Sequence, residues 1–148
     1  MRITIAIACL ALLAAGCGSG DSGDRLTGTS WELVSIESMA PDEQPSTTID
    51  DPAKYTVVFG DDGRAAFRVD CNRGNATWMA DSPAPDSGGL TFGPLALTKM
   101  FCPPPSQDAK VVAALDMVRG YLLSDGQLHM SMEADSGILH WRPAAAAP

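Results

Sequence analysis

From Leu26 onward, short apolar stretches alternate with clusters of Gly, Asp and Pro, which is typical of a strand-rich domain with many turns. The segments 39–52 and 80–89 are rich in Pro and in polar or small residues and are predicted to be loops. The apolar stretches predict strands at residues 31–36, 55–59, 64–69, 75–79, 90–92, 95–100, 127–132 and 137–142.

Two pairs of these strands are predicted to form hairpins. Strands 55–59 and 64–69 flank Gly60-Asp61-Asp62-Gly63, a strong turn signal. In the C-terminal pair, a loop at Asp135-Ser136 would pair Met130 with Trp141. One face then holds Leu128, Met130, Met132, Leu139 and Trp141, and the other holds His129, Ser131, His140 and Arg142. We expect the apolar face to be buried and the two His, diagonal to each other, to point to solvent.

One helix is predicted between the two hairpins. Cys102-Pro103-Pro104-Pro105 interrupts regular structure, because three consecutive residues lack an N–H. Ser106 is a suitable N-cap, and apolar residues then recur at helical spacing up to Gly120. The prediction is an amphipathic helix over residues 107–119. The fold class is therefore α+β: a strand-rich, curved antiparallel sheet or partly open β-barrel with one packed helix.

The N-terminal segment is typical of an export signal. Arg2 precedes an uncharged apolar run at residues 3–15, too short to span about 30 Å of hydrocarbon. The run ends in Leu13-Ala14-Ala15-Gly16-Cys17, which resembles the lipobox of bacterial lipoproteins, with Ala14 where Leu is usual. The resemblance implies a diacylglycerol on Cys17. The alternatives are an ordinary signal peptide with an incidental Cys17, or Cys9 as the acceptor after a six-residue apolar core.

These signals divide the chain into a signal peptide at 1–16, a flexible polar tether at 17–25, a folded domain at 26–142 and a disordered tail at 143–148. The lipid would anchor the protein in the bacterial cell membrane, facing the extracytoplasmic side. The net charge of −8 argues against nucleic acid as a partner. Without Arg2, the mature chain carries nine basic and 18 acidic residues, a charge of −9.

Cys71 and Cys102 remain once Cys9 is removed with the signal and Cys17 is lipidated. An even pair in an exported domain predicts one disulfide, which would stabilise the fold by roughly 3 to 4 kcal/mol. The alternative is a redox-active or metal-binding pair, against which stand the absence of a C-x-x-C motif and the presence of only two His.

No motif in the sequence indicates an enzyme or a cofactor. His129 and His140 could share a metal ion, but a third ligand at a telling spacing is missing, and a solvated pair is the simpler interpretation. The carboxylates of Asp61, Asp62, Asp125 and Asp135 lie beside Gly turns, where backbone hydrogen bonding explains them. The side chains of Met100, Met117, Met130 and Met132 could line an adaptable pocket, although core packing explains them equally simply.

The order of several short motifs resembles the META domain, the HslJ-like family of small bacterial envelope proteins. The motifs are Thr29-Ser30-Trp31-Glu32-Leu33, Phe59-Gly60-Asp61-Asp62-Gly63-Arg64, Cys71-Asn72-Arg73, Asn75-Ala76-Thr77-Trp78, Leu90-Thr91-Phe92-Gly93-Pro94-Leu95 and Thr98-Lys99-Met100-Phe101-Cys102-Pro103. Asp70 stands where the family commonly has Gly. The resemblance implies a curved or partly open barrel with a packed helix, an association with envelope stress, and no catalytic residues.

Two functions fit these observations. The first is a non-enzymatic envelope lipoprotein whose tethered domain binds another protein or helps maintain the envelope. The second is a carrier or sensor of small apolar ligands or lipids held in the barrel interior. A solid interior would favour the first function, and a pocket of several hundred cubic ångströms would favour the second.

Overall fold

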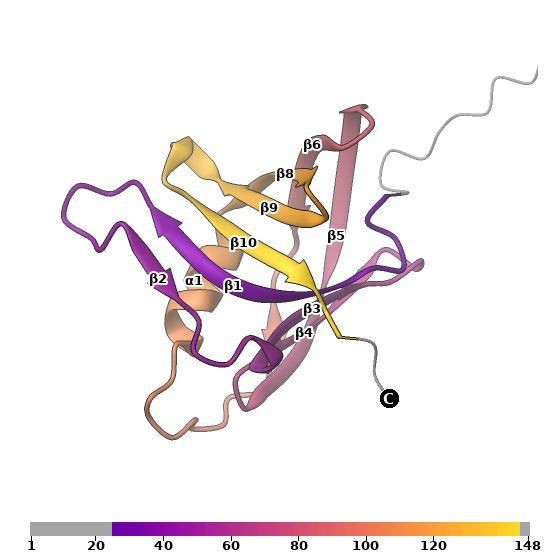
Figure 1. Ribbon diagram of the computed structural model, residues 1–148. Coiled ribbons are helices and arrows are strands. Elements are labelled where there is room, and N and C mark those ends of the chain that lie inside the picture. The colour runs from indigo at the N-terminus through magenta and orange to yellow at the C-terminus, as the bar shows by residue number, and fades with distance from the viewer. Residues whose placement is uncertain (1–24, 146–148) are drawn as a thin grey trace, which may run out of the picture.

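The computed structural model describes residues 25–145, which form a closed antiparallel barrel of eight strands with one α-helix (Figure 1). Strands pair in the order β10-β9-β8-β6-β5-β4-β3-β1, and β1 pairs back to β10. β2 adds to β1, and β7 adds to β5. The elements are β1 Ser30–Ser38, β2 Ser46–Thr48, β3 Tyr55–Phe59, β4 Arg64–Val69, β5 Asn72–Ala84, β6 Ser87–Phe92, β7 Ala96–Leu97, α1 Asp108–Asp116, β8 Val118–Ser124, β9 Gln127–Met132 and β10 Gly137–Pro143, with 3-10 turns at Pro52–Lys54 and Glu133–Asp135.

The predicted combination of antiparallel strands and one helix is confirmed, and the barrel is closed rather than partly open. The β3–β4 hairpin has the predicted bounds, because alternating apolar residues and the Gly60–Gly63 turn specify it locally. The turn before β5 is also locally encoded. Asp70 has a φ of +55°, a conformation that Asp tolerates better than most residues.

The C-terminal hairpin keeps its predicted faces but not its predicted register. Leu139 pairs with Met130 and Trp141 with Leu128, a shift of two residues. The connection contains the Glu133–Asp135 turn instead of a two-residue loop. A shift of two residues preserves the alternation of faces, so all five apolar residues of the predicted buried face are in the core.

The predicted helix is too long, because its second half is a strand. α1 ends at Asp116, and β8 begins at Val118. Val118 and Tyr121 fit helical spacing, but both are buried in a strand that pairs with β6 and β9. Ser106 lies one residue before the N-cap position, and its Oγ accepts a hydrogen bond from the Asp108 N–H at 3.3 Å.

The predicted loop at 80–89 is a long hairpin between β5 and β6. Gly88 and Gly89 permit the pairing, because a Cβ on either would collide with Asp81. Within the predicted loop 39–52 the structure forms the short strand β2, and the predicted strand 95–100 is reduced to β7. Pro143, assigned to the tail, ends β10, and the Ala144 N–H donates to the Ser30 carbonyl.

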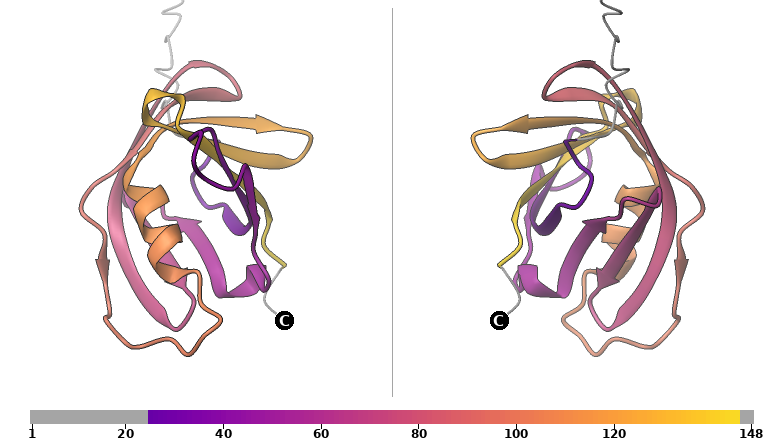
Figure 2. Two further views of the ribbon diagram at one scale, coloured as in Figure 1. Left: turned by 90° about the vertical axis from the view of Figure 1, so that its left-hand side faces the viewer. Right: turned by 90° about the vertical axis from the view of Figure 1, so that its right-hand side faces the viewer.

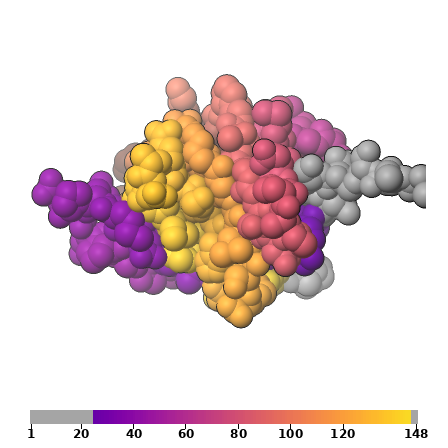
Figure 3. Space-filling model, turned by 90° about the horizontal axis from the view of Figure 1, so that it is seen from above, coloured from indigo at the N-terminus to yellow at the C-terminus, as the bar shows by residue number. Residues whose placement is uncertain are grey.

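The centre of the barrel is filled with apolar side chains. Trp141, Phe59, Leu33, Leu90, Leu128, Met130 and Leu139 are each less than 2% exposed. α1 lies across one end of the ring of strands (Figure 2, left) and adds Val111, Ala114 and Leu115 to the core. Seen from above, side chains of β8, β9 and β10 cover the top of the barrel, and the β1–β2 segment projects to one side (Figure 3).

The two ends of the barrel carry different features. The described chain begins at Arg25, which pairs with Asp86 of the β5–β6 turn at 3.1 Å. The β3–β4 turn lies at this end too, since the Gly28 N–H donates to the Phe59 carbonyl. In an antiparallel barrel the β4–β5 and β9–β10 turns must lie at the opposite end, where α1 is found (Figures 1 and 2).

We expect Trp141→Ala to lower the free energy of unfolding by about 3 to 5 kcal/mol, because it empties a large site in the packed core. Urea unfolding followed by circular dichroism measures the loss. Leu122→Ala on β8 is the control, since Leu122 is 46% exposed and its truncation should cost about 0.5 kcal/mol. Equal losses in the two variants would contradict the assignment of Trp141 to the core.

Candidate functional site

An open groove of about 700 Å³ lies at the α1 end of the barrel. One wall is the segment from Leu95 to Phe101, and the other is the exposed side of α1, formed by Ala109, Val112 and Ala113. Val69 and Asn72 form the floor. Most of the lining is apolar, and the charged groups in it are Lys99 and Asp108.

A buried amide holds the first wall in place. The Asn72 side chain, 6% exposed, accepts hydrogen bonds from Thr98 Oγ1 and the Met100 N–H, both at 2.8 Å. Its Nδ2 donates to the Met100 carbonyl at 3.1 Å. Because unpaired buried groups are costly, this one amide fixes the backbone of residues 98–100 against β5.

A disulfide between Cys71 and Cys102 holds the end of the same wall, and the two Cα atoms are 5.5 Å apart. Pro103, Pro104 and Pro105 follow at once and carry the chain toward α1. Asn72 and the disulfide therefore act on a single segment, at its middle and at its end. The predicted Cys71–Cys102 disulfide is present in the structure. That the two thiols are oxidised in the exported protein stays a prediction.

The groove wall exposes two large apolar side chains. Met100 is 60% exposed and Phe101 is 84% exposed. Of the four Met named as pocket candidates, Met130 and Met132 belong to the core, Met117 is partly buried against it, and Met100 lines the groove. The groove was not among the features predicted from the sequence. The available signal was a Met-Phe pair directly before a Cys-Pro-Pro-Pro run that cannot join the sheet.

His129 and His140 are directly opposed on β9 and β10, not diagonal, because of the register shift. Their Nδ1 atoms lie 2.9 Å apart, and His140 Nε2 lies 3.0 Å from Glu37 Oε2 on β1. With both rings neutral, His140 donates through Nε2 to Glu37 and accepts at Nδ1 from His129. The two rings are half-buried, so the expectation that they point freely to solvent is corrected.

The electrostatics of the histidine pair disfavour a second positive charge. Burial, and then the neighbouring His140, lower the pKa of His129 below its usual 6.5, against a weaker opposing effect of Asp125. The Nδ1 atoms face each other and Glu37 lies on the far side of His140, so the three groups form a chain and not a ligand shell. Within residues 25–145, no group of three or more His, Cys, Asp or Glu is arranged to hold a metal ion.

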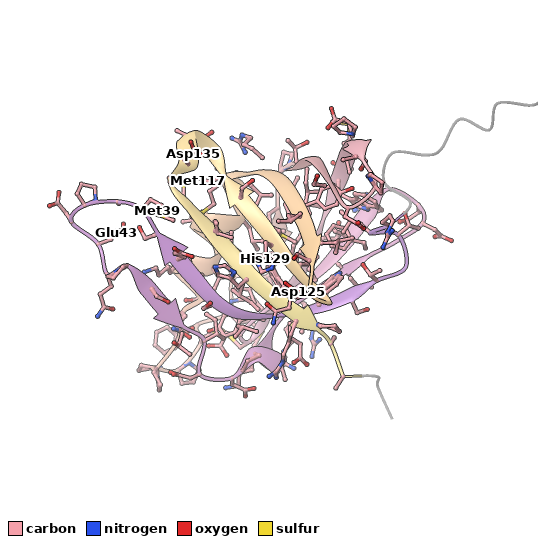
Figure 4. The ribbon with its side chains drawn as sticks, turned by 45° about the horizontal axis from the view of Figure 1, so that its top comes forward. Met39, Glu43, Met117, Asp125, His129 and Asp135 are labelled. Atoms are coloured by element: carbon pink, nitrogen blue, oxygen red, sulfur yellow. A yellow bond between two sulfur atoms is a disulfide. The ribbon has the colours of Figure 1, made fainter. Side chains whose placement is uncertain are left out.

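The candidate carboxylates are separated by the fold. Asp125 and Asp135 lie at opposite ends of the β9 region with His129 between them (Figure 4). Both adopt positive φ in their turns. Asp62 Oδ1 accepts a hydrogen bond from the Arg64 N–H at 3.0 Å across the β3–β4 turn. The Asp62 carboxylate therefore has the turn role that the sequence suggested. For Asp61, Asp125 and Asp135, backbone hydrogen bonding by the carboxylate stays a prediction.

Residues 24–144 match the META domain family. This chain is a META domain protein. The match spans the whole barrel. Of the motifs that carried the resemblance, Gly60–Gly63 forms a turn, residues 98–101 belong to the groove wall, and Cys71-Asn72 with Cys102 holds that wall in place.

Solved structures show the same fold at low sequence identity. A protein from Burkholderia xenovorans, studied by NMR, is 19% identical with a TM-score of 0.63, and the match covers 95% of this chain and 99% of that one. A crystal structure of a DUF4847 family protein from Bacteroides vulgatus is 15% identical with a TM-score of 0.57, covering 81% of this chain and 95% of that one. No curated protein matches the sequence significantly.

The predicted anchor lies outside the described residues, as do Cys9 and the signal peptide. Arg25, the last residue of the predicted tether, lies in a turn and pairs with Asp86. No helix within residues 25–145 has the length and apolarity needed to cross a membrane.

The lowered pKa of His129 predicts acid sensitivity. The unfolded chain binds a proton at His129 near pH 6.5, whereas the folded protein does so only at lower pH, so the free energy of unfolding should fall as the pH drops below about 6.5. Urea midpoints at pH 7.5 and 5.5 test this. His129→Gln should show a smaller decrease than the natural protein, and an equal decrease in both would contradict it.

Proposed function

We propose that this protein is a non-enzymatic envelope lipoprotein, anchored through Cys17, whose META domain binds another protein in the groove between residues 95–101 and α1. The observation that carries the proposal is the exposure of Met100 and Phe101 beside an apolar groove of about 700 Å³. Exposed apolar groups that rim a groove are characteristic of interaction sites.

The polar groups of the groove support binding rather than catalysis. The Asn72 amide is occupied by Thr98 and Met100, and Asp108 Oδ1 accepts from the Ala109 N–H at 2.8 Å. Catalysis would need a nucleophile, acid or base free to meet substrate beside a second polar group. The remaining charged group of the lining is Lys99. Binding is therefore the function that the chemistry of the groove favours.

The position of the groove fits a tethered protein. Seven residues lie between Cys17 and Arg25, so the eight Cα–Cα steps allow an extended reach of roughly 29 Å. The groove lies at the barrel end opposite Arg25. With a lipid on Cys17, the groove would face away from the bilayer, toward partners in the surrounding compartment. The net charge of −9 expected for the mature chain also opposes flat contact with anionic lipid.

A carrier of small apolar ligands is the second candidate, favoured by the groove volume, which lies within the usual range for ligand sites. Side chains fill the barrel centre, where such a ligand was expected to bind. The ligand would therefore occupy the groove. Native mass spectrometry of protein purified from membranes distinguishes the candidates, since a carrier would retain a lipid-sized mass and an interaction domain a protein.

Membrane attachment should depend on Cys17. Cys17→Ala is expected to abolish incorporation of labelled palmitate and to move the protein from the membrane fraction to the soluble fraction, because the acyl chains supply the anchor. Cys9→Ala is the control and should remain acylated. Labelled or membrane-bound Cys17→Ala protein would contradict the anchor assignment.

Partner binding should depend on Phe101. A photo-crosslinking residue at position 97, in the full chain produced in its own bacterium, should give one discrete protein adduct, and Phe101→Glu should reduce it at least tenfold by charging the groove rim. Met79→Glu on β5 is the control, because Met79 is 73% exposed but does not line the groove. Equal adducts from both variants would contradict a role for the groove.

A further inference from the structure

The groove exists because the barrel wall divides between β6 and β8. β6 pairs with β8 only at Ser87, Gly88 and Gly89. Beyond that point β8 is preceded by α1 instead of more strand, while β6 is followed by β7, which pairs with β5 alone. A strand edge therefore faces a helix across an open space, where a barrel would ordinarily place another strand.

The exposed edge of β7 presents hydrogen-bonding groups to this space. Ala96 pairs with Asn75, and the Thr98 N–H donates to the Arg73 carbonyl at 3.0 Å, so the backbone groups of these two residues point toward β5. Because successive residues of a strand point to alternate sides, the N–H and C=O of Leu97 point away from β5. No strand within residues 25–145 pairs with that side of β7.

Small residues lie on both sides of this edge. Gly74 lies opposite Leu97, and a Cβ there would collide with the Ala96 carbonyl, so Gly74 is what allows β7 to pair closely with β5. Across the groove, α1 presents the small side chains of Ala109 and Ala113. Small residues on the facing wall leave room for side chains that enter from a bound strand.

The charges at the edge indicate which strand fits. Lys99 and Asp108 are the charged residues of the groove lining. The Asp108 carboxylate accepts from the Ala109 N–H at 2.8 Å, whereas Lys99 forms no ion pair among the described residues. A cation without an ion pair beside an apolar groove complements a segment with apolar side chains and an acidic neighbour.

We propose that the groove binds an extended, acidic and apolar segment of a partner protein by adding it as a strand to the free edge of β7, with alternate side chains between β7 and α1. This inference rests on the proposed function and specifies its partner. Backbone pairing supplies general affinity, the apolar walls select the side chains, and Lys99 selects the acidic flank.

A synthetic peptide, acetyl-Glu-Glu-Val-Thr-Val-Thr-Val-Thr-Glu-Glu-amide, tests the mode of binding. The peptide is added to the lipid-free protein. We expect saturable binding up to millimolar peptide and slower hydrogen exchange of the Leu97 amide by NMR. The same peptide N-methylated at its Val residues, or flanked by Lys, should bind at least tenfold more weakly.

Leu97→Pro removes the outward N–H without touching the bonds to β5, and should weaken binding about tenfold. Leu97→Val keeps the N–H and is the matched control, expected within threefold of the natural protein. Lys99→Glu should reverse the preference between Glu-flanked and Lys-flanked peptides. Circular dichroism and urea midpoints establish that each variant folds.

The outcomes separate this inference from the proposed function. If Phe101→Glu abolishes binding but Leu97→Pro and N-methylation leave it unchanged, strand addition is wrong and the groove remains a side-chain site. If, without peptide, the hydrogen exchange of the Leu97 amide becomes slower as the protein concentration rises, a second copy of the chain is the occupant, and the inference is overturned. Unprotected Leu97 at millimolar peptide also overturns it, and loss of the position-97 adduct as well would remove the proposed function.

Discussion

Pairing of β1 with β10 joins the first and last strands of the domain and converts a sheet into a barrel. The ladder runs from Trp31 opposite Pro143 to Ser38 opposite Gly137, with one irregularity after Leu33. Its inner face contributes Leu33, Leu139 and Trp141 to the core. On its outer face, Arg142 donates to Glu32 through two nitrogens, and His140 contacts Glu37. Since the largest fully buried side chain, Trp141, belongs to this seam, the packing of the core depends on closure.

Pairing around the rest of the barrel is uneven. The β6–β8 ladder has three residue pairs, as does β1–β3, whereas β1–β10 has seven. α1 replaces the missing strand length and covers the core with Val111, Ala114 and Leu115. A helix cannot satisfy the edge of a strand, however, because its backbone groups bond within it. The topology that completes the core thus creates an unpaired edge and an apolar groove beside it.

Local pattern predicted the elements whose partners are adjacent in sequence and failed where distant partners decide. The β3–β4 hairpin was predicted to the residue. Val111, Ala114, Leu115, Val118 and Tyr121 fit one helical face, yet β8 forms because β6 and β9 supply partners on both sides. The register of β9 and β10 was wrong by two residues because alternation fixes the face and not the turn. The Met-Phe pair before Cys-Pro-Pro-Pro signals an exposed segment, but the sequence alone does not place it opposite α1, since residues 95–101 and 108–113 are brought together by Asn72, the disulfide and closure of the barrel.

The segment from Thr98 to Cys102 combines a fixed backbone with exposed apolar side chains. This combination indicates whether the segment serves only the stability of the fold. Asn72 and the disulfide hold the backbone, while Met100 and Phe101 extend outward. If the segment served only to close the end of the barrel, its large apolar side chains would be expected in the core, where burial would stabilise the fold by about 1.5 to 3 kcal/mol each. At exposed positions, polar residues would serve that purpose equally well. Fixing the backbone lowers the entropy lost when a partner binds, because the groove wall is already ordered. An ordered backbone that carries exposed apolar side chains is thus the feature on which the proposed binding role rests.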